Sequence, residues 1–281
     1  MAVLLGVVVA LSFGTADFLG GRASKVATTV AVLFLGMLVA VTGSFIVAAL
    51  VDADATGADY AYGAIAGAVN VTGLGLLYYG LANYRVGVVA PLCAVMGALV
   101  PATWGVVQGE RPSAIVFAGA ALAIVAAGLI AREAEEHVDD PNRTRSIVLA
   151  LFAGAALGSS LIFYSETSED SGMWPIVSGR VAGLTLVSIA LVALVVRSDV
   201  RFPTGPARGF ALTTGALDVA ATALLLVAVR RGYLVVVAPL ASLAPAFTVV
   251  FAWMFLHERI ARVQLAGLLV GALGLVLVAS G

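Results

Sequence analysis

Long apolar stretches alternate with short polar connectors along the whole chain. Each stretch has roughly 20 residues, which is the length that an α-helix needs to cross about 30 Å of hydrocarbon. No connector is long enough to hold a soluble domain. The pattern predicts an all-α integral membrane protein with ten transmembrane helices, at residues 2–20, 28–50, 60–82, 87–108, 113–131, 146–165, 174–196, 209–229, 233–256 and 263–280.

The first apolar stretch could also be a cleaved signal peptide. It lacks the basic segment that precedes the apolar core of such peptides. Its residues 11–14 (LSFG) have a counterpart in the sixth stretch, at residues 155–158 (AALG). We therefore interpret residues 2–20 as a helix of the mature bundle.

The second half of the chain repeats the first. The sequence VVAPL occurs at residues 88–92 and again at residues 236–240, a separation of 236 − 88 = 148. The same separation joins several pairs of identical or similar residues: Gly67 and Gly215, Asn70 and Asp218, Glu110 and Glu258, and Arg111 and Arg259.

Each half contains five of the predicted spans. Because five is odd, the second half enters the membrane from the opposite side, and the halves form two inverted five-helix repeats over residues 1–137 and 146–281. Secondary transporters are built this way, since two interchangeable halves can rock around a central site and open it to either side. The repeat therefore indicates a carrier that works by alternating access.

Composition excludes several other classes of protein. Apolar residues make up 62% of the chain and charged residues 11%, whereas soluble domains are about half apolar and about a quarter charged. The single cysteine, Cys93, excludes an internal disulfide, and His137 and His257 lie in connectors without a metal-ligand cluster. The only lysine, Lys25, is not part of an ATPase phosphate-binding loop. We expect no cofactor, no metal and no nucleic-acid partner.

Several short motifs occur in the order and spacing of a known family. VAPL opens the fourth and ninth predicted helices, GERP and HERI precede the fifth and tenth, GTADFLGG closes the first, and GALDVAATALLLVAVRRG forms most of the eighth. In these features the whole chain resembles the EamA group of the drug/metabolite transporter superfamily. The resemblance implies a secondary carrier in the cell membrane, not an enzyme, with a cavity between its two halves.

The expected cargo is a small metabolite, an amino acid or a drug-like solute, and the expected direction is export. Coupling to protons would supply the energy for uphill transport. The other expected partners are membrane lipids, and the sequence leaves the oligomeric state open.

Asp218 is the most informative polar residue because it lies near the middle of the eighth predicted span. A carboxylate there costs about 2.5–3.5 kcal/mol on insertion scales, so it must face the bundle interior or water. It could bind a proton or the substrate, or it could be a structural acid paired with an arginine. Arg180 lies at a depth in the seventh span from which it could reach Asp218, although it could also extend to the near interface.

Two further polar residues are candidates for substrate or ion binding. Asn70 is the repeat partner of Asp218, and its amide could contact the substrate or form a hydrogen bond between helices. Asp17 lies close to the predicted end of the first helix, where Gly20 and Gly21 follow it. A capping or interfacial role is therefore open for Asp17 beside ion binding.

Four prolines lie in the fourth and ninth predicted helices. A proline removes one backbone hydrogen bond from a helix, which is tolerated where helices line a cavity or where neighbours satisfy the freed group. We expect these two helices to line the cavity and to move during transport, although a proline in the first turn also simply suits a helix start. The candidates are Pro91, Pro101, Pro239 and Pro245.

Two alternative functions fit the sequence less well. An intramembrane enzyme needs a nucleophile and a base, and an aspartyl pair would require Asp17 and Asp218 at one depth, where we expect different depths. A channel should show a ring or row of like polar groups, which one aspartate and one asparagine do not make.

Both chain termini are expected outside the cytoplasm. The connectors on the face opposite the termini hold most of the Lys and Arg residues, and the positive-inside rule places such a face in the cytoplasm. This departs from the usual EamA arrangement. With Cys93 replaced by Ser, a membrane-impermeant maleimide on whole cells should label a single cysteine at Ser171 and spare one at Thr144. The reverse labelling would contradict the prediction.

Overall fold

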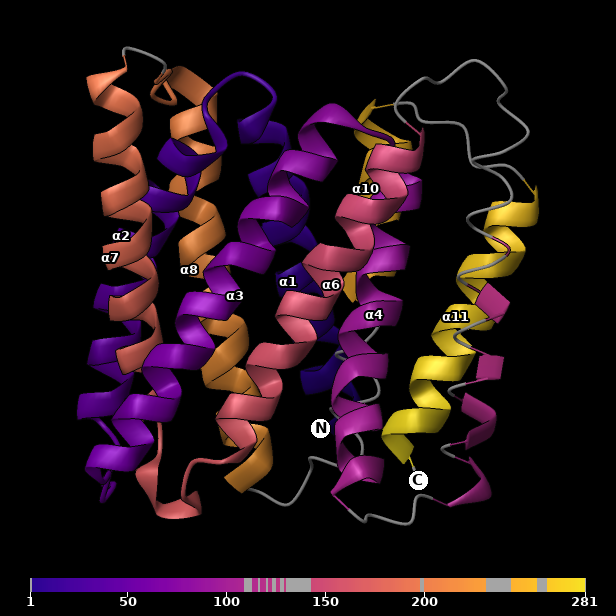
Figure 1. Cartoon of the computed structure of the whole chain (residues 1–281), viewed down its shortest axis with the longest axis horizontal. Helices are drawn as coiled ribbons and strands as arrows, with labels where there is room; N and C mark the ends of the chain where they lie inside the picture. The colour runs from indigo at the N-terminus through magenta and orange to yellow at the C-terminus, as the bar shows by residue number, and fades with distance from the viewer. Residues whose placement is uncertain are drawn as a thin grey trace.

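The computed structural model describes residues 2–108, 143–197, 200–230, 244–256 and 262–280, together with separate residues between 113 and 129. Within these ranges the chain is helical and has no strand. The α-helices form a bundle with α2 and α7 at one end and α11 at the other (Figure 1). Their bounds are α1 Ala2–Ser24, α2 Thr29–Ala49, α3 Gly57–Asn83, α4 Val86–Val107, α6 Arg143–Ser165, α7 Trp174–Val196, α8 Gly205–Arg230, α10 Ala244–Leu256 and α11 Arg262–Ser280, with a 3-10 turn, η1, at Glu169–Ser171.

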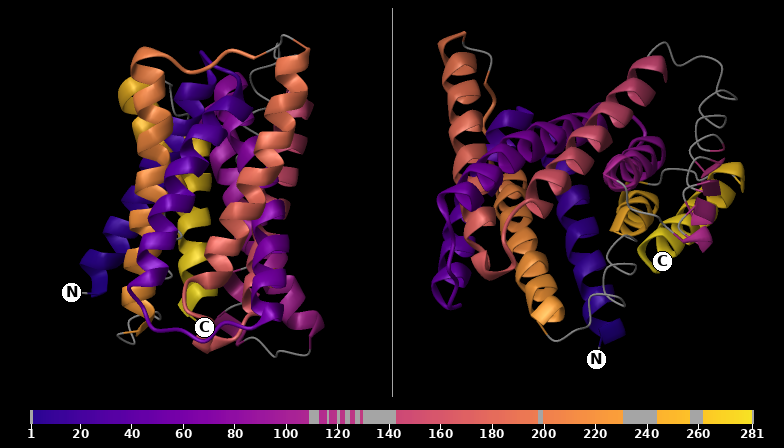
Figure 2. Two further views of the ribbon diagram at one scale, coloured as in Figure 1. Left: turned by 90° about the vertical axis from the view of Figure 1, so that its left-hand side faces the viewer. Right: turned by 60° about the horizontal axis from the view of Figure 1, so that its bottom comes forward.

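The helices support a membrane protein without establishing ten spans. Five of the described helices, α1, α2, α3, α6 and α7, are long and apolar enough to cross a membrane. The helix α8 coincides with the eighth predicted span but contains Asp218 and two arginines. Much of the fifth predicted span and the first part of the ninth lie outside the described residues. Both marked ends of the chain lie toward the same side of the bundle (Figures 1 and 2).

The helix α3 begins at Gly57, three residues before the predicted start, because of a capping box. The backbone N–H of Asp59 donates to the Thr56 hydroxyl at 3.4 Å, and the backbone N–H of Thr56 donates to the Asp59 carboxylate at 2.8 Å. These two bonds satisfy backbone donors that the first helical turn leaves free. The sequence signal was the Thr-x-x-acid pattern at residues 56–59.

The helix α1 runs to Ser24 and does not end at residue 20 as predicted. The predicted end falls at the pair Gly20-Gly21, but both glycines lie against α3. A Cβ added to Gly20 would lie 2.3 Å from the ring of Tyr78, and one added to Gly21 would lie 2.5 Å from Cβ of Leu81. The two glycines therefore allow two helices to approach closely, and α1 continues past them.

Close helix crossings occur in pairs that follow the sequence repeat. A Cβ added to Gly67 on α3 would lie 2.0 Å from the carbonyl oxygen of Gly179 on α7. A Cβ added to Gly215 on α8 would lie 2.1 Å from the carbonyl oxygen of Gly36 on α2. Gly67 and Gly215 are separated by 215 − 67 = 148 residues, so repeat partners make the same kind of contact.

A second pair of crossings relates α1 to α6. A Cβ added to Gly14 on α1 would lie 3.3 Å from the backbone nitrogen of Thr248 on α10, and one added to Gly158 on α6 would lie 3.0 Å from Cβ of Val100 on α4. Thr248 and Val100 are again separated by 248 − 100 = 148 residues. The helix α1 thus packs on α10 as α6 packs on α4.

The burial of Ser171 changes the labelling experiment proposed from the sequence. Its side chain is 2% exposed, and its hydroxyl donates to the Ser168 carbonyl at 2.6 Å. Glu169, on the same connector, is exposed, as is Thr144. A cysteine at Glu169 is therefore the better reporter of that face, with Thr144→Cys unchanged as its opposite.

Asp59 also joins the two halves of the chain. Its carboxylate is 2% exposed and accepts hydrogen bonds from the Ser168 backbone N–H at 2.6 Å and from the Ser168 hydroxyl at 3.1 Å. Together with the Thr56 cap, these bonds tie the start of α3 to the connector between α6 and η1.

Removing this carboxylate should destabilise the folded bundle. Asp59→Ala leaves the Thr56 and Ser168 donors without their acceptor, which costs about 1–3 kcal/mol, and should lower the thermal unfolding midpoint of the purified protein. Asp59→Asn keeps one acceptor oxygen and should have a smaller effect. Asp52→Ala removes an exposed acid from the connector between α2 and α3 and serves as the control. Equal midpoints for Asp59→Ala and this control would refute the assignment.

Candidate functional site

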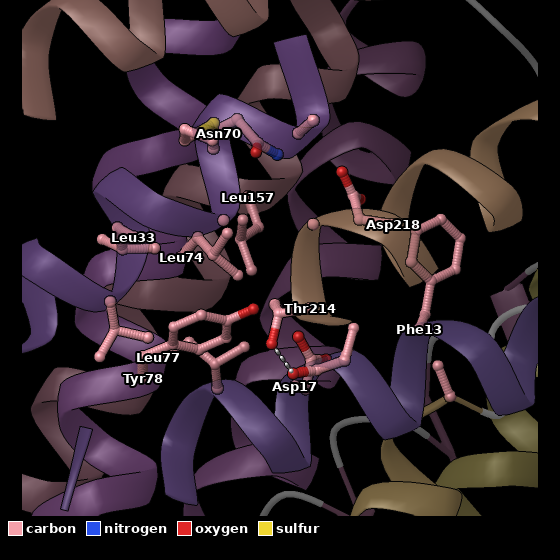
Figure 3. A pocket seen from close by; sticks show the side chains of 17 residues that line it. Phe13, Asp17, Leu33, Asn70, Leu74, Leu77, Tyr78, Leu157, Thr214 and Asp218 are labelled. Carbon is pink, nitrogen blue, oxygen red and sulfur yellow. Dashed lines mark hydrogen bonds between the residues drawn. The ribbon is translucent and has the colours of Figure 1, made fainter. Parts of the chain in front are cut away.

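A cavity of about 230 Å³ lies among helices from both halves of the chain. Side chains from α1, α2, α3, α6, α8 and α10 line it, and most of them are apolar. Its lining includes the polar residues Asp17, Asn70, Tyr78, Thr214 and Asp218 (Figure 3). Three of the four substrate- or ion-binding candidates from the sequence thus line one cavity.

The neutral polar groups of the cavity are partly bound to the helices around them. The Asn70 amide donates to the Ser160 hydroxyl on α6 at 3.3 Å. The Thr214 hydroxyl bonds to the Phe210 carbonyl of its own helix at 2.9 Å and lies 3.4 Å from the Ala16 carbonyl of α1. In Figure 3 the Tyr78 hydroxyl points toward Thr214. These bonds leave free lone pairs or N–H groups on several side chains, which a solute could use.

Arg180 on α7 forms an ion pair with Asp218 on α8. One terminal guanidinium nitrogen, Nη1, donates to the Asp218 carboxylate, and the other terminal nitrogen, Nη2, donates to the Thr222 hydroxyl at 3.1 Å. Arg180 is 8% exposed, whereas the Asp218 side chain is 36% exposed and borders the cavity. Of the two sequence-based alternatives for Arg180, the structure forms the pair with Asp218.

Asp17 lies within α1 and lines the cavity, because the helix continues beyond Gly20 and Gly21. The capping role considered from the sequence does not apply at this position. Asp17 and Asp218 were expected at different depths, yet both border the same cavity. Within the part of the chain that the structure describes, the Asp17 carboxylate has no ion pair or hydrogen bond.

The four prolines are placed less centrally than the acids. Pro91 and Pro101 lie within α4, on the side of the bundle where α4 packs on α6, and neither lines the cavity. Pro101 Cδ would lie 3.1 Å from a Cβ added to Gly158 of α6. Pro245 follows Ala244, which lines the cavity at the start of α10. Pro239 lies outside the described residues.

Several lining residues were missed or left undecided from the sequence. Tyr78 lines the cavity and Tyr79 does not, although the sequence offered no means to choose between them. Met37 also lines the cavity. It is the repeat partner of Arg180, because 180 − 37 equals the separation 179 − 36 of the crossing glycines Gly179 and Gly36. Applying the repeat to α2 and α7 would therefore have found it.

Comparison with protein-family models identifies one family. No curated protein matches the chain. The model of the EamA-like transporter family matches two segments, residues 1–132 and 144–280. These segments cover each half of the chain in turn, including the cavity residues and the Arg180–Asp218 pair. The apolar helices, the two matched segments and the cavity between them agree, and the chain belongs to the EamA-like transporter family of multi-pass membrane transporters.

Proposed function

We propose that the chain is a secondary carrier that exports a small solute across the cell membrane by alternating access, coupled to protons. The observation that carries this proposal is the cavity, which is bordered by α1, α2 and α3 of the first half and by α6, α8 and α10 of the second. A site between two halves can open to either side when one half tilts against the other.

The paired crossings support two inverted five-helix repeats. The helix α1 packs on α8 and α10, and α6 packs correspondingly on α3 and α4. One contact lacks its counterpart among the described residues. Whereas α1 packs on α3, α6 makes no comparable packing with α8. In an inverted repeat, the two alternative states differ by exchanging such unequal contacts.

The Arg180–Asp218 pair offers a means of proton coupling. Arg180 lies on α7 and Asp218 on α8, and these two helices do not pack against each other along their lengths. A relative movement of the helices would therefore separate the two charged side chains. A carboxylate inside a membrane that loses its counter-ion must gain a proton or water. Among the described residues, the other titratable groups close enough to interact electrostatically with Asp218 are Asp17 on α1, Tyr78 on α3 and Tyr164 on α6.

An intramembrane enzyme gains no support from the two acids in the cavity. An aspartyl pair requires two carboxyl groups that act on the same water molecule, whereas Asp218 is engaged by Arg180. A carrier uses both acids without this requirement.

Asp218 is expected to be the coupling acid. Asp218→Asn keeps the shape and removes the titrating group, so the variant should insert and fold but lose transport driven by a pH gradient, while solute exchange persists. The measurement is uptake into proteoliposomes of the solute that metabolite profiling identifies. Uphill transport by Asp218→Asn with an unchanged pH profile would show that Asp218 is structural.

Arg180→Gln is the companion variant. It removes the counter-ion and keeps a hydrogen-bond donor, so the pH profile of transport should shift toward higher pH and the amount of inserted protein should not change. If the pH profile of transport does not shift, Arg180 has no role in proton coupling.

Alternating access should bring α6 and α8 together. In the first half, Gly21 of α1 contacts Leu81 of α3. The repeat separation is 158 − 14 = 144 residues between α1 and α6 and 215 − 67 = 148 residues between α3 and α8. The corresponding residues of the second half are therefore Ser165 (21 + 144) and Val229 (81 + 148). In a Cys93→Ser background, Ser165→Cys with Val229→Cys should form an oxidative cross-link in membranes, detected by mass spectrometry. The control pair is Asn70→Cys with Ser160→Cys, whose native side chains are 3.3 Å apart. Cross-linking of the control pair alone would count against this movement.

A further inference from the structure

The charges that border the cavity do not cancel. Asp17 and Asp218 are its acidic lining residues, and no basic side chain lines it among the described residues. Arg180, which reaches Asp218 from α7, compensates one of the two carboxylates. The carboxyl group of Asp17 is left without a counter-ion in the part of the chain that the structure describes.

An uncompensated carboxylate inside a membrane is costly and calls for a cation or a proton. Asp17 lines the cavity, and in Figure 3 Phe13 and Asp218 lie to one side of it and Tyr78 to the other. A bound proton or a water molecule would satisfy the carboxyl group alone. Neither would use the apolar surface around it.

That apolar surface is extensive for so small a site. Leu33, Leu74, Leu77 and Leu157 line the cavity together with Phe13. The volume, about 230 Å³, is several times that of one water molecule, about 30 Å³, and lies below the roughly 300–1,000 Å³ of sites for drug-sized ligands. The described residues hold no cluster of ligands for a metal ion. The shape and chemistry fit a small molecule with one positive charge and an apolar body.

The geometry points to a small organic ammonium ion as the cargo, with its charged nitrogen at Asp17 and its apolar body against the leucine wall. This inference rests on the proposed function, because it names the chemical class that the carrier moves. Tyr78 and Phe13 add aromatic surface, which attracts cations. An anion would meet two carboxylates, and a zwitterion would need a cation for its own carboxylate, although Arg180 is already engaged by Asp218.

Three probes that share a phenyl ring on a short alkyl chain and differ in charge separate these alternatives. They are 2-phenylethylammonium, the neutral 2-phenylethanol and the anionic 3-phenylpropionate. Binding of the radiolabelled amine to the purified full-length protein, measured by equilibrium dialysis near neutral pH, should be displaced by unlabelled amine. The alcohol and the anion should compete at least tenfold less well.

Asp17 should determine this preference. Asp17→Asn should weaken amine binding at least tenfold and leave the alcohol unaffected, whereas Asp17→Glu should retain a preference for the amine. Asp52→Asn, which neutralises an exposed acid outside the cavity, should bind as the unaltered protein does. Should Asp17→Asn fail to fold, the competition series with the unaltered protein and Asp17→Glu still decide the question.

The outcomes distinguish this inference from the proposed function. Equal competition by the alcohol, or unchanged amine binding by a folded Asp17→Asn variant, would overturn the cation site. If proteoliposomes then exchange a neutral or anionic solute, the carrier function stands without it. Conversely, amine binding that depends on Asp17 without any exchange across the membrane would support the site and overturn the carrier.

Discussion

A charged group inside hydrocarbon must find its counter-charge within the protein, and this constraint organises the centre of the bundle. The buried guanidinium of Arg180 reaches from α7 to the carboxylate of Asp218 on α8, and its second terminal nitrogen, Nη2, donates to the Thr222 hydroxyl. The two partners differ in exposure, because Arg180 is covered by protein whereas Asp218 borders the cavity. Any movement that separates the two helices must therefore provide another partner for each charge, and this requirement links helix movement to the contents of the cavity.

The glycine crossings hold the polar residues at the correct separation. Gly179 directly precedes Arg180, and Gly36 directly precedes Met37, so each crossing places the next side chain at the centre of the bundle. Membrane helices lack a strong hydrophobic drive to associate, and small residues compensate by allowing close van der Waals contact. A methyl group at Gly67 or its repeat partner would meet a carbonyl oxygen and push the helices apart, together with the groups that they carry.

Much of this arrangement could be predicted from the sequence, because it depends on features that are written locally or repeated. The apolar stretches located the helices that the structure describes, and the depth of Asp218 and Arg180 in their spans allowed their pairing. The cavity position of Asp17 could not be predicted, since Gly20 and Gly21 can either end a helix or admit a neighbour, and only the contact with α3 decides between these uses. Pro91 and Pro101 were misleading for a related reason. A proline shows that a backbone hydrogen bond is missing, but not whether the helix faces a cavity or, as α4 does, packs on another helix.

The repeat preserves packing more closely than chemistry. The crossing glycines have glycines as partners, whereas Arg180 corresponds to Met37, Asp218 to Asn70, and Asp17 to Leu161 (161 − 17 = 158 − 14 = 144). Packing must be alike in both halves if they are to exchange conformations, because each half then makes the contacts that the other has released. A single cargo, however, needs a charged contact only once within the shared cavity. The two halves can therefore pack and move alike and still differ in charge. Asp17, Arg180 and Asp218 have uncharged repeat partners, and these three residues mark the binding site within the symmetric bundle.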